Sequence, residues 1–224
     1  MTRRRQLVIF VKAPRRGTVK TRLARAIGAA AALRLYRRMA SDLIRRLAGD
    51  PRWSSILAVT PDRFARHGRF WPASVARIEQ GRGDLGQRMA RGFRRAPPGP
   101  LVLIGSDIPD LDRASIAAAF RALGRARAVI GPATDGGYWL IGLRHRPAPV
   151  KLFHGVAWSS PQVLSQTLAN FERPEHVIQL APRADIDDGE GYWRWRQGRR
   201  RRLQPPRRIC SLKRGISSTK LHGR

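Results

Sequence analysis

Cysteine is almost absent from this chain of 224 residues, which contains only Cys210. A single cysteine cannot form an internal disulfide, and it excludes a metal site built from several cysteines. Chains with so little cysteine are typical of reducing compartments. The sequence therefore predicts a cytoplasmic protein.

The chain also lacks an apolar run long enough to cross a membrane. Its start, "MTRRRQLVIFVKAP", places basic residues before a short apolar run, as a signal peptide does. Lys12 and Pro14 end that run early, and no small-residue cleavage site follows. Residues 6–11 are therefore predicted to form a buried strand, and no membrane span is expected.

Acidic residues are scarce, because 15 Asp and Glu face 45 Lys and Arg, for a formal net charge of +30. Dense positive charge binds the phosphates of nucleic acids without reading their sequence. The alternative is a general preference for arginine on solvated surfaces. Twelve basic residues and no acid follow from Arg194 onward, but the larger part of the excess is spread over residues 1–193. This spread favours the surface preference.

Apolar periodicity is lost from about Gly198, where the chain continues as "RRRRLQPPRR". Segments of this composition cannot bury enough apolar surface to order themselves. We expect one folded domain over residues 1–197 and a basic, disordered tail over residues 198–224. Any binding of nucleic acid is expected to be through that tail.

Strand-like and helix-like segments alternate along the folded part. Apolar residues recur at helical spacing between Leu23 and Leu47, which predicts one long helix with Thr18 or Thr21 as its cap. The run "PLVLIGSD" at 100–107 is apolar on both faces, as a central parallel strand is. The other predicted strands are 54–60, 73–79, 127–133, 138–143 and 176–180, and the other predicted helices are 85–96, one capped by Asp112, one started by Ser160 and Pro161, and 188–197. This alternation predicts a single three-layer α/β domain, with helices on both faces of a mostly parallel, twisted sheet.

Basic residues gather where the first predicted strand ends. The stretch "VKAPRRGTVKTRLA" at 11–24 passes through a Pro/Gly loop into a helix and carries Lys12, Lys20 and Arg22. Backbone N–H groups and the helix dipole favour an anion at such a helix start. The stretch is neither a Walker loop nor a Rossmann fingerprint. We expect it to bind phosphate; the alternative is one more basic loop in a basic protein.

Asp107 stands directly after the strongest predicted strand, in "GSDIPDL". Ligands of open parallel sheets bind beyond the carboxyl ends of the strands. A carboxylate there is well placed to hold Mg²⁺ or Mn²⁺, which prefer oxygen ligands and bridge to phosphates. The alternative is a residue that only forms a turn. For Asp112, nearby, a helix cap is the better interpretation.

Two further stretches have a functional and a structural interpretation. In "GPATDGGYWLIGL" at 131–143, the glycines after Asp135 are explained equally by a sharp turn and by a ligand lying against the backbone. In "ADIDDGEGY" at 184–192, the acids are explained by a cation site or by a solvated helix start. These alternatives remain open at the level of residues.

These motifs occur in the order of a known family. The segments "FVKAPRRGTVKTRLA", "QGRGDLGQRM", "IGSDIPDL", "GPATDGGYWLIGL", "LFHGVAWSSPQVLSQT" and "DIDDGEGY" together resemble a bacterial family of glycosyltransferase-A-like proteins, described as arsenosugar or selenium-associated transferases. The resemblance covers about residues 6–192. The first and third segments also resemble nucleotidyltransferases, including phospholactate and molybdopterin-cofactor guanylyltransferases.

The resemblance implies a nucleotide-diphospho-sugar transferase fold. It implies that Lys12, Lys20 and Arg22 are phosphate-loop residues and that Asp107 is a metal ligand. By likeness to the nucleotidyltransferases, Asp185 and Asp187 are further metal ligands. Two departures are visible: the last motif continues with residues 188–191, "DGEG", in place of Thr-Pro-Glu-Asp, and Ser106–Asp107 lacks the Asp-x-Asp pair of many glycosyltransferases.

We therefore expect a transferase that uses an activated nucleotide donor, most simply a nucleotide sugar, with Mg²⁺ or Mn²⁺ and a small-molecule acceptor. The alternatives are a nucleotidyltransferase that acts on a nucleoside triphosphate and a phosphorylated small molecule, a nucleic-acid-binding basic protein, and a fold that has lost catalysis. All transfer hypotheses require the N-terminal basic loop and Asp107 to meet in one pocket. The expected catalytic residues are Lys12, Lys20, Arg22 and Asp135; the expected substrate-binding residues are Ala13, Pro14, Gly17, Thr21, Gly86, Arg88, Ser106, Gly136, Gly137 and Tyr138; the expected metal ligands are Asp107, Asp185 and Asp187.

Overall fold

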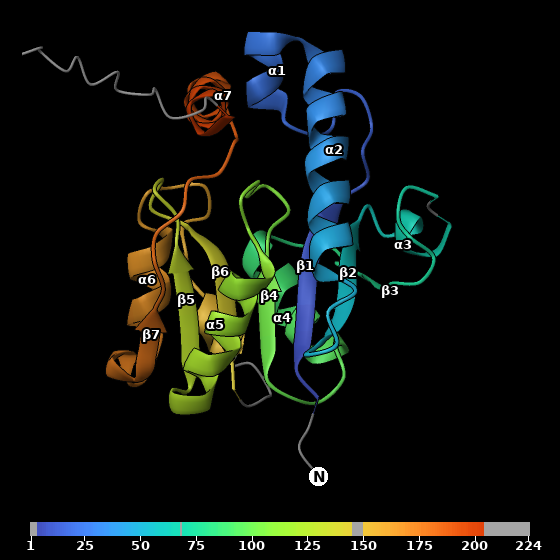
Figure 1. The fold of residues 1–224 in the computed structure, drawn as a ribbon. Coiled ribbons are helices and arrows are strands. Elements are labelled where there is room, and N and C mark those ends of the chain that lie inside the picture. The colour runs from blue at the N-terminus through green and yellow to red at the C-terminus, as the bar shows by residue number, and fades with distance from the viewer. Residues whose placement is uncertain (1–3, 68, 145–149, 204–224) are drawn as a thin grey trace, which may run out of the picture.

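The computed structural model describes residues 4–67, 69–144 and 150–203, which form a single α/β domain around one seven-stranded sheet (Figure 1). The strand order is β3-β2-β1-β4-β6-β5-β7. Only β6 runs antiparallel to its neighbours, β4 and β5, and the other pairs are parallel. The strands are β1 (Gln6–Lys12), β2 (Ser54–Thr60), β3 (Ala76–Glu79), β4 (Leu101–Ile104), β5 (Ala128–Pro132), β6 (Tyr138–Leu143) and β7 (Val177–Gln179). The predicted fold class is confirmed.

Helices cover both faces of this sheet. On one face, apolar side chains of α2 (Ala29–Leu47) and α5 (Arg113–Arg125) pack against alternate residues of β1, β2 and β4. On the other face, α4 (Leu85–Arg95), η1 (Val150–Phe153) and α6 (Val163–Ala169) cover the remaining alternate residues. Because successive strand residues point to opposite faces, strands buried on both faces are apolar throughout, as Leu101–Ile104 is.

The long helix expected between Leu23 and Leu47 is two helices. Gly28 has φ +82° and separates α1 (Thr21–Ile27) from α2, so that the chain changes direction there. The residue that precedes α1 is Lys20, which lies in the left-handed region with φ 50° and ψ 46°. Lys20 therefore occupies the N-cap position in place of Thr18 or Thr21, and its side chain makes no capping hydrogen bond.

Other helix starts agree more closely with the sequence. Asp112 caps α5, because its Oδ1 accepts from the Ser115 backbone N at 2.8 Å. α6 begins at Val163, slightly after the predicted Ser160 start, although Ser160 Oγ accepts from the Gln162 backbone N at 3.3 Å. Two short elements, α3 (Arg63–His67) and η2 (Pro174–His176), complete the connections.

The last helix, α7, spans Gly189–Leu203 and packs near α1 (Figure 1). It therefore runs beyond the domain boundary expected at residue 197. The remainder of the expected tail, 204–224, lies outside the described residues. In the ranges that the structure describes, no helix is both long and apolar enough to cross a membrane.

Candidate active site

Two adjoining cavities open where β1, β2 and β4 end at their carboxyl edge. The first, of about 420 Å³, runs along the ends of β1 and β2 and the turn into α1. The second, of about 560 Å³, lies between the loop after β4, the start of β6 and the segment before α6. Both cavities are lined by five common residues: Arg22, Leu85, Gly105, Asp107 and Asp187. The two cavities therefore form one continuous cleft.

Lys20 lies at the junction of the cavities, between two carboxylates. Its side chain is 3% exposed, and its Nζ lies 3.0 Å from Asp107 Oδ2 and 3.6 Å from Asp187 Oδ1. Among the described residues Nζ has no hydrogen-bond partner, so it is held by charge alone. Arg22 Nη1 lies 3.4 Å from Asp187 Oδ2 and is more exposed. The structure thus brings together the N-terminal basic loop and two acidic motifs that are far apart in the sequence.

The loop that carries Asp107 is fixed from two sides. Arg46 Nη1, from α2, donates to the carbonyl oxygens of Pro109 and Leu111 at 3.2 and 2.6 Å. Arg183 Nη1 donates to the carbonyl oxygen of Asp110 at 3.2 Å. Three successive carbonyls are therefore held by two guanidinium groups, which limits the positions that the Asp107 carboxylate can take.

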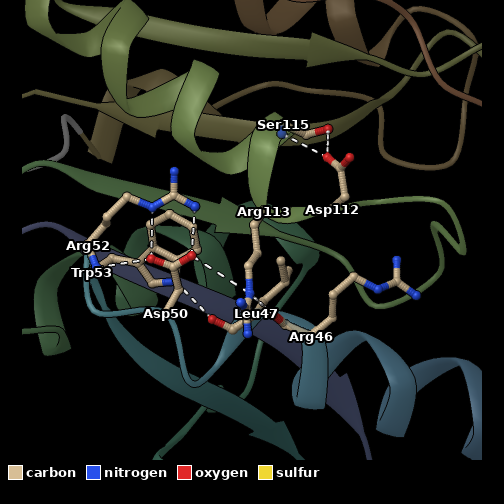
Figure 2. Close-up of polar contacts among 8 residues, drawn as sticks. All are labelled: Arg46, Leu47, Asp50, Arg52, Trp53, Asp112, Arg113 and Ser115. Atoms are coloured by element: carbon tan, nitrogen blue, oxygen red, sulfur yellow. Dashed lines mark hydrogen bonds and ion pairs between the residues drawn. The ribbon is translucent and has the colours of Figure 1, made fainter.

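Arg46 is itself part of a larger polar cluster, drawn in Figure 2. Arg113 Nε, at the start of α5, donates to the Arg46 carbonyl oxygen at 2.7 Å. Asp50 accepts from Arg52 Nε and Nη2 at 2.8 and 2.7 Å, and Arg113 lies 3.7 Å away. The hydrogen bonds from Arg52 lower the pKa of Asp50 to about 2. This cluster joins the end of α2 to the start of α5, behind the loop that follows β4.

Among the cavity residues that were not predicted from the sequence, two polar side chains fix the end of β1. Tyr36, expected only as part of an apolar stripe, donates its hydroxyl to the Lys12 carbonyl oxygen and accepts from the Lys12 backbone N, both at 2.8 Å. Burial, with the nearby charge of Asp107, raises the Tyr36 pKa to about 12. Gln80 is buried, and its Nε2 donates to the carbonyl oxygens of Val11 and Ala58. Both side chains line the first cavity and fix the end of β1.

The turn between β5 and β6 has a structural explanation. Gly136 has φ +87°, and a Cβ atom there would overlap the backbone of Pro161. The Leu164 backbone N donates to the Gly136 carbonyl oxygen at 2.9 Å, which ties the turn to α6. Asp135 Oδ1 accepts from the Gly137 backbone N at 3.0 Å. Packing therefore requires glycine at position 136, whereas Asp135 and Gly137 line the second cavity.

The remaining predicted residues divide into two groups. Ser106 and Thr21 line the first cavity with Lys12, and Tyr138 lines the second. The Tyr138 hydroxyl, however, points to Met89 Sδ at 3.9 Å, and burial raises its pKa above the ordinary value. The other predicted substrate-binding residues line neither cavity; these are Ala13, Pro14, Gly17, Gly86, Arg88 and Gly136.

Gly86 and Arg88 have structural contacts that account for them. A Cβ at Gly86 would overlap the side chains of Trp158 and Phe153, so a close approach of α4 to that segment requires glycine. Arg88 Nε donates to the Gly83 carbonyl oxygen at 2.9 Å and closes the turn before α4. A role for either residue in binding substrate stays a prediction.

Two of the acidic residues at the junction fit a divalent ion. One oxygen of Asp107 and one of Asp187 lie 3.0 and 3.6 Å from the same cationic nitrogen, Lys20 Nζ, so the two carboxylates can share a single cation. Asp185 is close enough that its pKa is raised, first by burial and further by Asp135, Asp187 and Asp107, against the opposing effect of Lys20. Among the described residues, no three His, Cys, Asp or Glu side chains are arranged to hold an ion unaided. Two carboxylates fit an Mg²⁺ or Mn²⁺ ion whose other ligands are phosphates and water.

Comparison with known proteins shows the family. Residues 43–160 match the family described as "Uncharacterized protein conserved in bacteria (DUF2064)". The chain belongs to this family. It is also similar to a solved structure from Desulfovibrio desulfuricans G20, described as a "putative nucleotide-diphospho-sugar transferase", with 32% identity, 82% of each chain covered and a TM-score of 0.74. No curated protein matches the chain.

More distantly related solved structures share the fold of this chain. One is 4-diphosphocytidyl-2C-methyl-D-erythritol synthase from Anaerococcus prevotii, with 10% identity, 88% of this chain and 98% of that chain covered, and a TM-score of 0.58. Another is glucosyl-3-phosphoglycerate synthase from Mycobacterium tuberculosis in complex with Mn²⁺ and UDP, with 10% identity, coverage of 82% and 71%, and a TM-score of 0.51. At this identity the likeness shows the fold alone. Both glycosyl and nucleotidyl transferases therefore occur among the neighbours.

Proposed function

We propose that this DUF2064 protein is an enzyme that transfers a group from an activated nucleotide donor, in the first instance a sugar from a nucleoside diphosphate sugar. The observation that carries the proposal is the convergence of Lys20, Asp107 and Asp187 at the junction of two cavities. The nucleotide-diphospho-sugar description of the Desulfovibrio relative supports it. The narrower label, an arsenosugar or selenium-associated transferase, stays a hypothesis about the acceptor.

In this proposal the first cavity holds the nucleotide, and its diphosphate lies at the junction. Lys12, Lys20 and Arg22 line that cavity and would neutralise the phosphates. Cations fixed where charge develops on a leaving group stabilise the transition state more than the ground state. Asp107 and Asp187 would hold a divalent ion, with Asp185 beside them. When bound, that ion supplies Lewis-acid stabilisation of the departing diphosphate.

The second cavity would hold the sugar and the acceptor. An acceptor hydroxyl oxygen forms a bond to the anomeric carbon while the bond from that carbon to the diphosphate oxygen breaks. The electron pair of the broken bond leaves with the nucleoside diphosphate. The hydroxyl proton would pass to a carboxylate of the cavity, and Asp135, which lines it, is the candidate base.

Calorimetry with Mn²⁺ and UDP-glucose, GDP-mannose or ADP-glucose tests the proposal. At least one donor is expected to bind, and Asp107→Asn should weaken its Mn²⁺-dependent binding by at least about tenfold, because loss even of an outer-shell partner of a metal costs about 10–100-fold. Asp42→Asn is the matched control, because it removes an equal charge on α2 from a surface ion pair with Arg45. Absence of binding by every donor, or equal weakening by both variants, would contradict the proposal.

A second candidate reaction keeps the same cleft. A triphosphate also fits a cavity lined by Lys12, Lys20 and Arg22, and attack on its α-phosphorus by a substrate phosphate would release pyrophosphate. The fold shared with the Anaerococcus synthase keeps this candidate open. Pyrophosphate release from GTP, ATP or CTP, with no transfer from nucleotide sugars, would select nucleotidyl transfer.

The domain boundary, the basic C-terminal residues and the cellular location are also part of the proposal. We propose that residues 1–197 form the catalytic unit, with α7 continuing to Leu203, and that the basic C-terminal residues are dispensable for transfer. The scarcity of cysteine supports a cytoplasmic location. Deletion of residues 204–224 should leave donor binding unchanged and abolish any salt-sensitive binding of RNA. RNA binding of equal strength after the deletion would favour the nucleic-acid hypothesis.

A further inference from the structure

The second cavity is acidic in a protein that is otherwise strongly basic. Its lining includes four carboxylates and one arginine, whereas the whole chain has 15 acids and 45 basic residues. The carboxylates come from three separate segments: Asp107 after β4, Asp135 after β5, and Asp185 and Asp187 before α7. A random sample of this surface would be basic. The composition therefore marks the cavity as a place where positive charge has been excluded.

The cations at the edge of this cavity are already paired. Arg22 lies 3.4 Å from Asp187, and Lys20, which lines the first cavity, lies 3.0 Å from Asp107. Within the described ranges, neither Asp135 nor Asp185 takes part in an ion pair. Asp135 Oδ1 accepts only the Gly137 backbone N there, so Oδ2 is left to accept from a ligand. This part of the cavity lining consequently offers hydrogen-bond acceptors and negative charge.

The remaining wall is aromatic and hydroxylic. Trp158 is half-buried and packs on Phe153, with ring centroids 6.3 Å apart, and Ser159 and Ser160 follow it. Ser159 is held with φ +66°, a conformation that costs a non-glycine residue about 1–2 kcal/mol and recurs at ligand sites. An indole ring beside carboxylate and hydroxyl oxygens suits a compound with many hydroxyl donors on an apolar carbon frame.

From this geometry we infer that the acceptor is an uncharged polyhydroxylated compound, a sugar or polyol without a phosphate group. The inference rests on the proposed function, because it takes the second cavity as the acceptor site. A phosphate on the acceptor would lie against Asp135 and Asp185, and it would have to separate the cations at the cavity edge from their present carboxylate partners. Hydroxyl groups, in contrast, can donate to both carboxylates. The charge of the cavity therefore also argues against the nucleotidyl reaction, whose second substrate carries a phosphate.

Matched acceptor pairs that differ by one phosphate test the inference. Release of nucleoside diphosphate from the donor that binds best would be followed with glycerol against glycerol 3-phosphate, and with glucose against glucose 6-phosphate, in the presence of Mn²⁺. In the wild-type chain the neutral member of each pair should stimulate release at least about tenfold more. Asp135→Asn, which keeps the oxygen that accepts from Gly137, should narrow that ratio by about tenfold, since a like-charge contact at close range is removed.

The ratio within one variant is the measurement, so a general loss of rate in Asp135→Asn does not affect it. Asp42→Asn should keep the wild-type ratio, although it alters the net charge equally. A preference for the phosphorylated member, or an Asp135→Asn ratio equal to that of wild type, overturns the inference. If donors bind by calorimetry and the phosphorylated acceptor is preferred, the proposed function stands and the acceptor class is wrong. If no donor binds, both fall together.

Discussion

Lys20 occupies the position between Asp107 and Asp187 at which a divalent ion would be shared, so the ammonium group and the ion compete. This competition predicts that Lys20→Met will bind Mn²⁺ more tightly than wild type when no nucleotide is present. Methionine has a stem of similar length and no charge, and the Lys20 side chain is 3% exposed. The substitution therefore removes the cation with little loss of packing.

The size of the effect follows from the two distances. At 3.0 and 3.6 Å, each ion pair is worth about 1 kcal/mol at the dielectric constant of water, and more if the site were dry. The carboxylates of Asp107 and Asp187 are 42% and 43% exposed, so the water-like value applies and salt lowers it further. The two pairs together are worth about 2 kcal/mol before screening, and salt reduces this to about 1.4 kcal/mol, which corresponds to a tenfold decrease in the Mn²⁺ dissociation constant.

Calorimetric titration of the nucleotide-free protein with Mn²⁺ measures this constant directly. Lys12→Met is the matched control, because Lys12 lines the same cavity but forms no ion pair with either carboxylate within the described ranges. Its Mn²⁺ affinity should equal that of wild type, and both variants should bind UDP more weakly. An unchanged or weaker Mn²⁺ affinity in Lys20→Met would show that the carboxylates do not share an ion at that position.

Three further predictions concern stability and the frame of the site. Gly136→Ala should lower the melting temperature by about 9 °C, because the left-handed backbone and the overlap with Pro161 together cost about 3 kcal/mol. Gly155→Ala, with φ +70° and open space around it, should cost only about 1 kcal/mol, or about 3 °C. Equal shifts in the two variants would refute the packing argument. Tyr36→Phe should destabilise the fold by about 2 kcal/mol in urea, because it leaves a backbone N–H at the end of β1 without its partner; a smaller loss than about 0.5 kcal/mol would mean that water replaces the hydroxyl. Asp50 has a folded pKa of about 2, below the ordinary 3.8, so the stability that it contributes is complete above pH about 4 and is lost as the pH falls through about 2. The difference in melting temperature between wild type and Asp50→Asn should shrink over that interval, and a constant difference would refute the assignment.

The sheet could be predicted because each strand has a local signature. All seven predicted strands exist. An apolar run such as 100–107 is stable as a strand only when both of its faces are covered, and the helices that alternate with the strands cover them. The strand order was not predictable in the same way. β6 inserts antiparallel between β4 and β5, and that choice depends on pairing between segments far apart in the chain.

The site was predictable where chemistry and position coincide. Lys20 and Asp107 are charged residues at loop positions after buried strands, so their pattern marks them as candidates, whereas Asp187 became a candidate only through the resemblance to nucleotidyltransferases. Tyr36 and Gln80 have no such signal in the sequence, because they contribute through hydrogen bonds to strand ends that are close to them only in the folded chain. The break at Gly28 shows the same limit. The apolar stripe of the sequence continues through Gly28, whereas the helical backbone is interrupted there.

The parts of the site differ in how freely they can move. Asp107 is on a loop in which the carbonyls of residues 109–111 are held by Arg46 and Arg183, and its own carbonyl oxygen accepts from the Ile186 backbone N at 3.3 Å. Lys20, in contrast, is held at Nζ by charge alone, at the end of a long side chain. If a nucleotide binds as proposed, the ammonium can turn to its phosphate and leave the carboxylates to share a divalent ion. We therefore expect the nucleotide to bind first and the metal with it, an order that neither the net charge of +30 nor any single motif would indicate.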